Sequence, residues 1–112
     1  MSASDWMFGL ADALEKLPDG PDEFRFHYGL RQGSMKVGLY APRGTDPQSP
    51  HQQDELYIVI SGNGEFSKNG ERIPFKAGDV LFVEAGAEHR FESFSADFAT
   101  WVVFWGPHGG EH

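Results

Sequence analysis

Short stretches of alternating apolar and polar residues follow one another along most of this chain, the pattern of β-strands with one buried face. Residues typical of turns separate these stretches. The predicted strands are 24–30, 35–41, 54–60, 65–68, 71–75, 80–83, 89–94 and 98–105. Many short strands at such close spacing predict an all-β sandwich or barrel.

Some of these segments carry further detail. Asn69-Gly70 predicts a tight hairpin, since a type I′ turn needs two residues with positive φ. Pro74 lacks the N–H that a central strand would use, so residues 71–75 are predicted to form an edge or irregular strand. Residues 98–105 are apolar on both faces, which predicts burial on both sides or a cover over one end of the barrel.

Residues 4–17 instead show helical spacing. Ser4 can cap the first turn, apolar residues recur from Trp6 to Leu17, and Pro18 ends the pattern. We expect this helix to pack its apolar stripe against the outside of the barrel or against a partner subunit. The predicted architecture is therefore all-β with one N-terminal helix.

At 112 residues the chain has the length of one domain with a single core. The sequence divides into an N-terminal helix and linker at 1–20, one barrel domain at 21–106 and a Gly-rich, flexible tail at 107–112. Residues 42–50 form a long predicted loop, and long loops beside a rigid scaffold often carry function.

The composition removes several classes of site and partner. Cysteine is absent, so a metal ion here must be held by imidazole and carboxylate groups. With a formal net charge of −8, the chain lacks the basic stripe that nucleic-acid binding needs, and the charge disfavours anionic membrane surfaces. The N-terminus lacks the features of a secretory signal, and no apolar run is long enough to span a bilayer, which predicts a cytoplasmic protein.

The candidate chemistry lies where two strands begin. His51 precedes one strand, Glu55 lies at its start, and His89 opens another strand after a turn at Gly86. On a straight strand, the Cα atoms of His51 and Glu55 would lie roughly 13 Å apart at about 3.3 Å per residue, so the segment must bend for both to reach one ion. Two histidines and one carboxylate form the facial set typical of non-haem iron(II) sites, and the same set also binds Zn, Ni or Mn.

From the spacing alone, a second interpretation stays open. Asp54 and Glu55 can be solvated charges at the start of a strand, with His51 and His89 as ordinary loop and turn residues.

The residues around these positions resemble a known family. Glu55 and Gly62 in one segment, and Gly78, Gly86 and His89 in another, are similar in order and spacing to the two sequence motifs of the cupins. The resemblance implies a small β-barrel of the jelly-roll type, usually dimeric, with a metal ion inside.

The same resemblance implies that the two histidines and Glu55 are metal ligands. It also reveals a departure, because Ser49 stands where these proteins usually have a further histidine, so one of the usual four ligands is missing. Gln53 is a candidate for a weak fourth ligand through its amide oxygen. In an alternative register, His51 and Gln53 would take the two histidine positions and Tyr57 the carboxylate position, which leaves Glu55 without a role.

Strand alternation predicts which side chains surround the ion. If the ligands on the two strands face inward, so do Tyr57 and Val59 on one strand and Phe91 and Ser93 on the other. These residues describe an aromatic pocket with few polar groups, suited to a small and partly apolar ligand.

The predicted function is a metal-binding, single-domain cupin that binds a small organic molecule at a two-histidine, one-carboxylate site. The divalent ion is Fe, Zn, Ni or Mn, and we expect a homodimer. An enzyme such as a dioxygenase, isomerase or lyase fits this description, but the fold by itself licenses no reaction. Two alternatives stay open: a non-catalytic module that binds a small molecule, and a metal-free protein that dimerises through its helix and the strand with Trp101 and Trp105.

Overall fold

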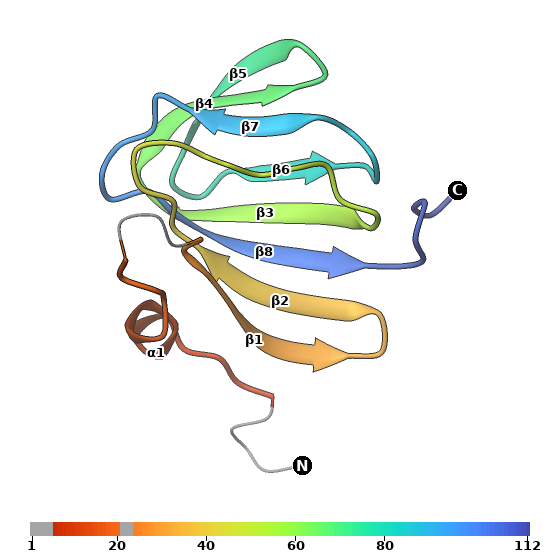
Figure 1. Ribbon diagram of the computed structural model, residues 1–112, viewed down its shortest axis with the longest axis horizontal. Helices are drawn as coiled ribbons and strands as arrows, with labels where there is room; N and C mark the ends of the chain where they lie inside the picture. The colour runs from red at the N-terminus through yellow and green to blue at the C-terminus, as the bar shows by residue number, and fades with distance from the viewer. Residues whose placement is uncertain (1–5, 21–23) are drawn as a thin grey trace.

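The computed structural model describes residues 6–20 and 24–112, and the prediction of an all-β sandwich or barrel is confirmed (Figure 1). A five-stranded antiparallel sheet has the order β1-β2-β8-β3-β6, and a three-stranded sheet has the order β5-β4-β7. The elements are α1 (Leu10–Glu15), β1 (Phe26–Gln32), β2 (Met35–Tyr40), β3 (Asp54–Ser61), β4 (Asn63–Lys68), β5 (Glu71–Lys76), β6 (Val80–Val83), β7 (His89–Glu92) and β8 (Ala99–Trp105).

The core lies between the two sheets, where the inward faces of the strands meet. Tyr57 of β3 stacks edge-on against Phe91 of β7 and Phe66 of β4, with ring centroids 4.8 Å and 5.7 Å away. Val102 and Phe104 of β8 are buried in the same cluster. Alternation along each strand therefore sends one set of side chains into a shared aromatic core, as the sequence pattern predicts.

The hairpin and edge predictions are confirmed. Asn69 and Gly70 have φ values of 50° and 87°, and Lys68 pairs with Glu71 across the turn between β4 and β5. The strand that contains Pro74 lies at the edge of the three-stranded sheet. By contrast, β8 lies in the middle of the five-stranded sheet, which accounts for its continuous apolar sequence.

The helix is shorter than its sequence pattern predicts. It covers Leu10–Glu15, while Ser4 lies outside the described residues, and Gly9 is the N-cap. Phe8 leaves the helical path and presses its ring against the backbone of Gly29, where a Cβ atom would come within 2.2 Å of the ring. This tertiary contact outweighs helical propensity. In the part of the chain that the structure describes, no helix is long and apolar enough to cross a membrane.

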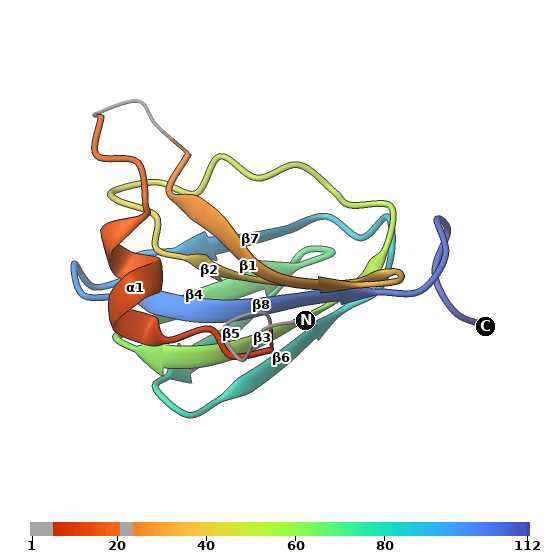
Figure 2. The same ribbon diagram turned by 90° about the horizontal axis from the view of Figure 1, so that it is seen from below.

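The C-terminal residues, predicted as a flexible tail, instead fold back onto the start of β3. The N–H of Gly109 donates to the carbonyl of Gln52 at 2.7 Å, and the N–H of Glu111 donates to Asp54 Oδ2 at 2.9 Å. The backbone groups of the tail thus find partners, which sequence position alone does not reveal. Figures 1 and 2 show this segment and α1 at opposite ends of the strands.

Candidate metal centre

The segment between His51 and Glu55 bends, as a shared site requires. Because β3 begins at Asp54, His51 lies before the strand, and Gln52 and Gln53 form a bend that turns its imidazole back towards Glu55. Glu55 is the second residue of β3, and its inward-facing side chain is 1% exposed.

A second turn places His89 opposite Glu55. Gly86 has a φ of 82°, and its N–H donates to the carbonyl of His51 at 2.8 Å. His89 then begins β7, which belongs to the three-stranded sheet, whereas Glu55 belongs to the five-stranded sheet. The same turn therefore positions one histidine and anchors the segment of the other, and the site bridges the two sheets.

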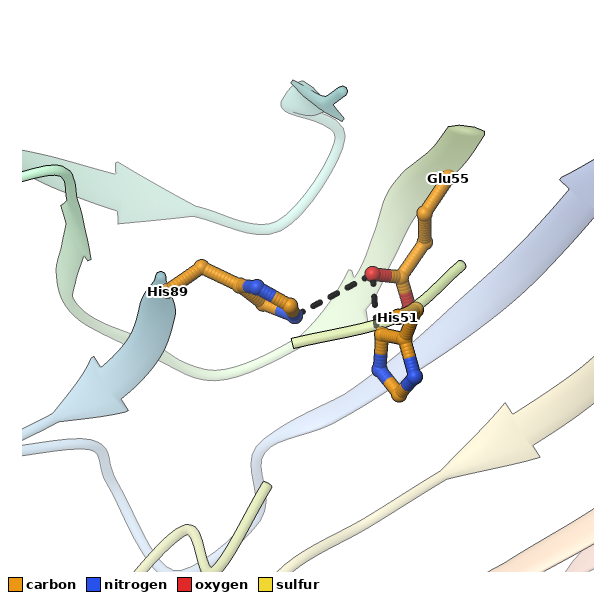
Figure 3. Close-up of side chains that lie close together, drawn as sticks. All are labelled: His51, Glu55 and His89. Carbon is orange, nitrogen blue, oxygen red and sulfur yellow. Dashed lines mark ion pairs between the residues drawn. The ribbon is translucent and has the colours of Figure 1, made fainter. Parts of the chain in front are cut away.

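The three predicted ligands converge (Figure 3). Glu55 Oε1 lies 3.2 Å from His89 Nε2 and 3.8 Å from His51 Nε2, and one ligand atom from each residue lies within 4.8 Å of the other two. Ligand atoms that are about 2.0 to 2.2 Å from one ion lie roughly 3 to 4.4 Å from one another. Small side-chain rotations therefore bring the three donors to the separations that a bound ion requires.

Buried polar atoms at this site lack partners. Both carboxylate oxygens of Glu55 and Nε2 of His89 make no hydrogen bond to the described residues. Nδ1 of His89 lies 2.9 Å from the carbonyl oxygen of Ala87, which can only accept, so Nδ1 carries a proton. In the neutral ring, Nε2 then directs a lone pair at a carboxylate oxygen, and either a proton on Nε2 or a metal ion between the two atoms removes this repulsion.

The electrostatics agree with a site that attracts a cation. Burial opposes a charge on His89, but Glu55 and the carbonyl of Ala87 outweigh burial and raise the pKa of His89. Burial lowers the pKa of the more exposed His51, and Glu55 only partly offsets this effect. Burial, reinforced by Glu55, holds the pKa of Tyr57 well above its ordinary value, so Tyr57 stays a neutral hydrogen-bond donor. A divalent ion bound to Glu55 would balance the negative charge of this buried carboxylate.

Gln53, predicted as a weak fourth ligand, has a different role. Its Nε2 donates to the carbonyl of Ser34 at 3.0 Å and to the carbonyl of Gly106 at 2.9 Å, which ties the turn after β1 to the end of β8. The alternative register is also not the one that the fold adopts, since Glu55 faces both histidines and the Tyr57 hydroxyl turns to another partner.

That partner is Gln48, a residue that the sequence analysis missed. Tyr57 donates to Gln48 Oε1 at 2.9 Å, and the same oxygen lies 3.3 Å from His51 Nε2. The family motif draws attention to Ser49, where a histidine usually stands, but Ser49 is exposed. Gln48 is the polar residue next to Ser49 in a loop expected to carry function, and this position was the feature of the sequence that could have indicated its role.

Three of the four residues predicted to line the pocket face inward, where they pack in the core. Tyr57, Val59 and Phe91 are buried in the core, and the ring of Tyr57 lies 6.1 Å from that of His89. Ser93 lies beyond the end of β7, has a φ of 49° and is exposed, so the prediction that it faces inward is wrong. The alternation ends because the chain leaves the sheet at Glu92.

Cavities reach the site from two sides. One of about 280 Å³ is bordered by His51, Lys36, Tyr28, Phe104 and His108. Another of about 280 Å³ lies on the far side of the loop and is bordered by Gln48, His89 and Arg90, among others. The His51 side chain, which is 30% exposed, is therefore open to solvent, whereas His89 borders the second cavity with a side chain that is 0% exposed.

This chain is similar in sequence to known proteins. The sequence profile of the Cupin domain matches residues 37–105. An uncharacterised protein of Streptomyces coelicolor is 43% identical over 77 residues, which cover 67% of this chain and 73% of the relative. An oxalate-binding protein of Thermotoga maritima is 44% identical over 90 residues, which cover 73% of this chain and 74% of that protein.

Solved structures show the same fold. A cupin-2 domain containing protein from Shewanella frigidimarina matches 88% of this chain and 94% of its own, with a TM-score of 0.67 and 15% sequence identity. The profile match includes β3, β7 and β8, the strands that carry and support the site, and the fold agrees with it. This chain therefore belongs to the cupin family.

Proposed function

We propose that this cupin binds a divalent metal ion through His51, Glu55 and His89 and, next to that ion, a small anionic ligand. The observation that carries the metal proposal is the set of buried donor atoms without partners, Glu55 Oε1 and Oε2 and His89 Nε2. Leaving such groups unpaired costs about 1 to 3 kcal/mol each, more for a charged group, and a bound ion relieves this cost.

Charge supports an anionic ligand. The chain has a net charge of −8, yet Lys36 and His108 border the cavity at His51. Lys36 Nζ lies 5.4 Å from the Phe104 ring centroid, and the His51 ring lies 4.9 Å from the same ring. Local positive charge beside an otherwise acidic surface concentrates anions at this opening. The oxalate-binding relative suggests a small carboxylate as the chemical class.

Metal content tests the first part of the proposal. Protein purified without a tag or chelator, and then reconstituted with Fe(II), Mn(II), Ni(II) or Zn(II), should hold close to one ion per chain by mass spectrometry. The His51→Ala/His89→Ala double variant should hold almost none, because two of three ligands are gone. His112→Ala, which replaces an exposed histidine, is the matched control and should bind like wild type. A wild-type protein that cannot be loaded with any of these ions contradicts the assignment.

Ligand binding tests the second part. Oxalate titrated calorimetrically into the metal-loaded protein should bind, and Lys36→Met should weaken its affinity by about tenfold, the equivalent of one charge-assisted contact. Lys76→Met is the matched control because Lys76 is exposed on β5, away from the cavity. Equal affinities for wild type and Lys36→Met would exclude this lysine as the source of anion preference.

Catalysis on the bound molecule is the second candidate function. The observation that favours it is Tyr57, whose hydroxyl donates to Gln48 and whose ring lies 6.1 Å from that of His89. A metal-bound ligand beside a buried hydroxyl has a group that can deliver a proton. Consumption of the ligand by metal-loaded wild type, abolished in Tyr57→Phe at unchanged metal content, would distinguish an enzyme from a binding module.

We also propose that the protein is a homodimer. Val80 and Phe82 of β6 are 59% and 49% exposed, and Ile58 of β3, which pairs with Val80, is 38% exposed. The neighbouring residues on this outer face, Leu56 and Trp101, are also apolar and half-buried. Monomeric proteins rarely expose a contiguous apolar surface of this kind, and a second copy with the same face would cover it.

A further inference from the structure

A chain of buried polar groups connects the metal centre to the loop after β2. Tyr40, at the end of β2, donates its hydroxyl to Asp46 Oδ1. Asp46 is 3% exposed, and its Oδ2 accepts from the N–H of Phe91 and from Gln48 Nε2, both at 2.8 Å. The loop is therefore attached to both sheets at the position that sets Gln48.

These contacts fix the orientation of the Gln48 amide. A carboxylate only accepts, so the group next to Asp46 Oδ2 must be the NH₂ of Gln48. The amide oxygen then faces the opposite way, towards Tyr57 and His51. A flipped amide would place an oxygen against Asp46 and an NH₂ against the Tyr57 hydroxyl, which loses the Asp46 contact.

The oxygen lies at a ligand-to-ligand distance from one of the three donors. Gln48 Oε1 is 3.3 Å from His51 Nε2, within the roughly 3 to 4.4 Å that separate two atoms bound to one ion. His51 Nε2 is also the atom that faces Glu55. Amide oxygens are hard donors that suit Mn, Fe and Co, and the second lone pair of this oxygen remains when Tyr57 donates to the first.

From this geometry we infer that Gln48, held by Asp46, is the fourth protein ligand of the metal ion, in place of the histidine that Ser49 replaces. The inference rests on the proposed metal site and goes beyond it by completing the donor set with a neutral oxygen. Gln53 does not compete for this role, since its amide is held by Ser34 and Gly106.

A simpler role for Gln48 must be separated from ligation. As a hydrogen-bond acceptor alone, Gln48 would act on the site only through Tyr57 and His51. In that case Tyr57→Phe, which removes the donor hydroxyl, should disturb the site as much as a change at Gln48. If Gln48 is a ligand, Tyr57→Phe leaves the amide oxygen in place and disturbs the site less.

Co(II) titration followed by visible absorption tests the inference, because the spectrum reports the donor set as well as the affinity. Gln48→Met, which keeps the length of the side chain and removes the oxygen, should weaken Co(II) binding on the order of tenfold to a hundredfold and alter the absorption bands. Gln48→Glu keeps an oxygen towards the ion but sets its second oxygen against Asp46, so it should retain more of the affinity than Gln48→Met, with shifted bands. Gln32→Met changes an exposed glutamine at the end of β1 and is the matched control.

The outcomes separate this inference from the function on which it rests. If wild type binds Co(II) but Gln48→Met has the same affinity and spectrum, Gln48 is not a ligand and the three-residue site stands. If Tyr57→Phe matches Gln48→Met in both readouts, the hydrogen-bonding role explains the result and the inference fails. If wild type binds no Co(II), both proposals fall. Ligation is supported if Gln48→Met binds Co(II) weakly while Gln48→Glu and Tyr57→Phe are folded and bind it more tightly than Gln48→Met does.

Discussion

Single buried polar residues control the geometry of this site more than its sequence motifs suggest. Asp46 accepts from Tyr40, from the backbone of Phe91 and from Gln48, although it lies in a loop with no strand pattern. Each donor points at a carboxylate oxygen in a buried setting, where unpaired groups are costly. One aspartate therefore joins β2, β7 and the loop that precedes His51.

Asp46→Asn should lower the free energy of unfolding by about 1 to 3 kcal/mol. The reason is that each oxygen of Asp46 accepts from two donors, so the amide NH₂ of the variant would face donors whichever oxygen it replaced. Urea denaturation followed by tryptophan fluorescence measures the change. Asp97→Asn, at an exposed position, should stay within about 0.5 kcal/mol of wild type. Equal losses in the two variants would show that the Asp46 contacts contribute no special stability.

At the scale of elements, the N-terminal segment is attached to the sheet through Phe8. Its ring lies 5.3 Å from that of Trp101 and presses on Gly29, next to the irregular pairing between β1 and β2. The short helix α1 follows and buries Ala13 against Leu39 of β2 and Ala99 of β8. The apolar side of α1 thus covers part of the outer face of the five-stranded sheet, as expected, but the helix has fewer turns than its sequence pattern predicts.

Gly29→Ala should destabilise the protein by about 1 to 3 kcal/mol, because the new Cβ atom would overlap the Phe8 ring. The size of the effect is measured by chemical denaturation in the wild-type and Phe8→Ala backgrounds. In the Phe8→Ala background the same substitution should cost far less, since the ring is gone. A similar cost in both backgrounds would mean that Gly29 is needed for its backbone alone.

For the whole molecule, the outer face of the five-stranded sheet determines the expected assembly. Phe82→Glu, on the exposed edge strand β6, should shift the proposed dimer towards monomer in sedimentation velocity, because charge cannot be buried between two apolar faces. Phe24→Glu replaces a comparably exposed apolar residue ahead of β1, at the opposite edge of the sheet from β6, and should leave the assembly unchanged. A wild-type protein that is monomeric at all concentrations would exclude dimerisation through the outer face of the five-stranded sheet.

The sequence by itself determined the strands, the Asn69-Gly70 hairpin, the edge position of the strand with Pro74 and the inward faces of β3 and β7. These features depend on residue periodicity and on backbone chemistry that is local to each segment. The sequence also indicated His51, Glu55 and His89 as candidate metal ligands, because their spacing resembles that of a known family.

Only the tertiary structure decided how those residues meet and what surrounds them. The placement of Gln48 depends on Asp46, which accepts from nearby Tyr40 and also from Phe91, a residue distant in sequence that becomes a neighbour when the two sheets close. The short helix, the docked C-terminal segment and the outward Ser93 likewise depend on contacts or chain reversals with no periodic signal. Periodicity records which side of an element is buried, but the partner across the core is set by the fold.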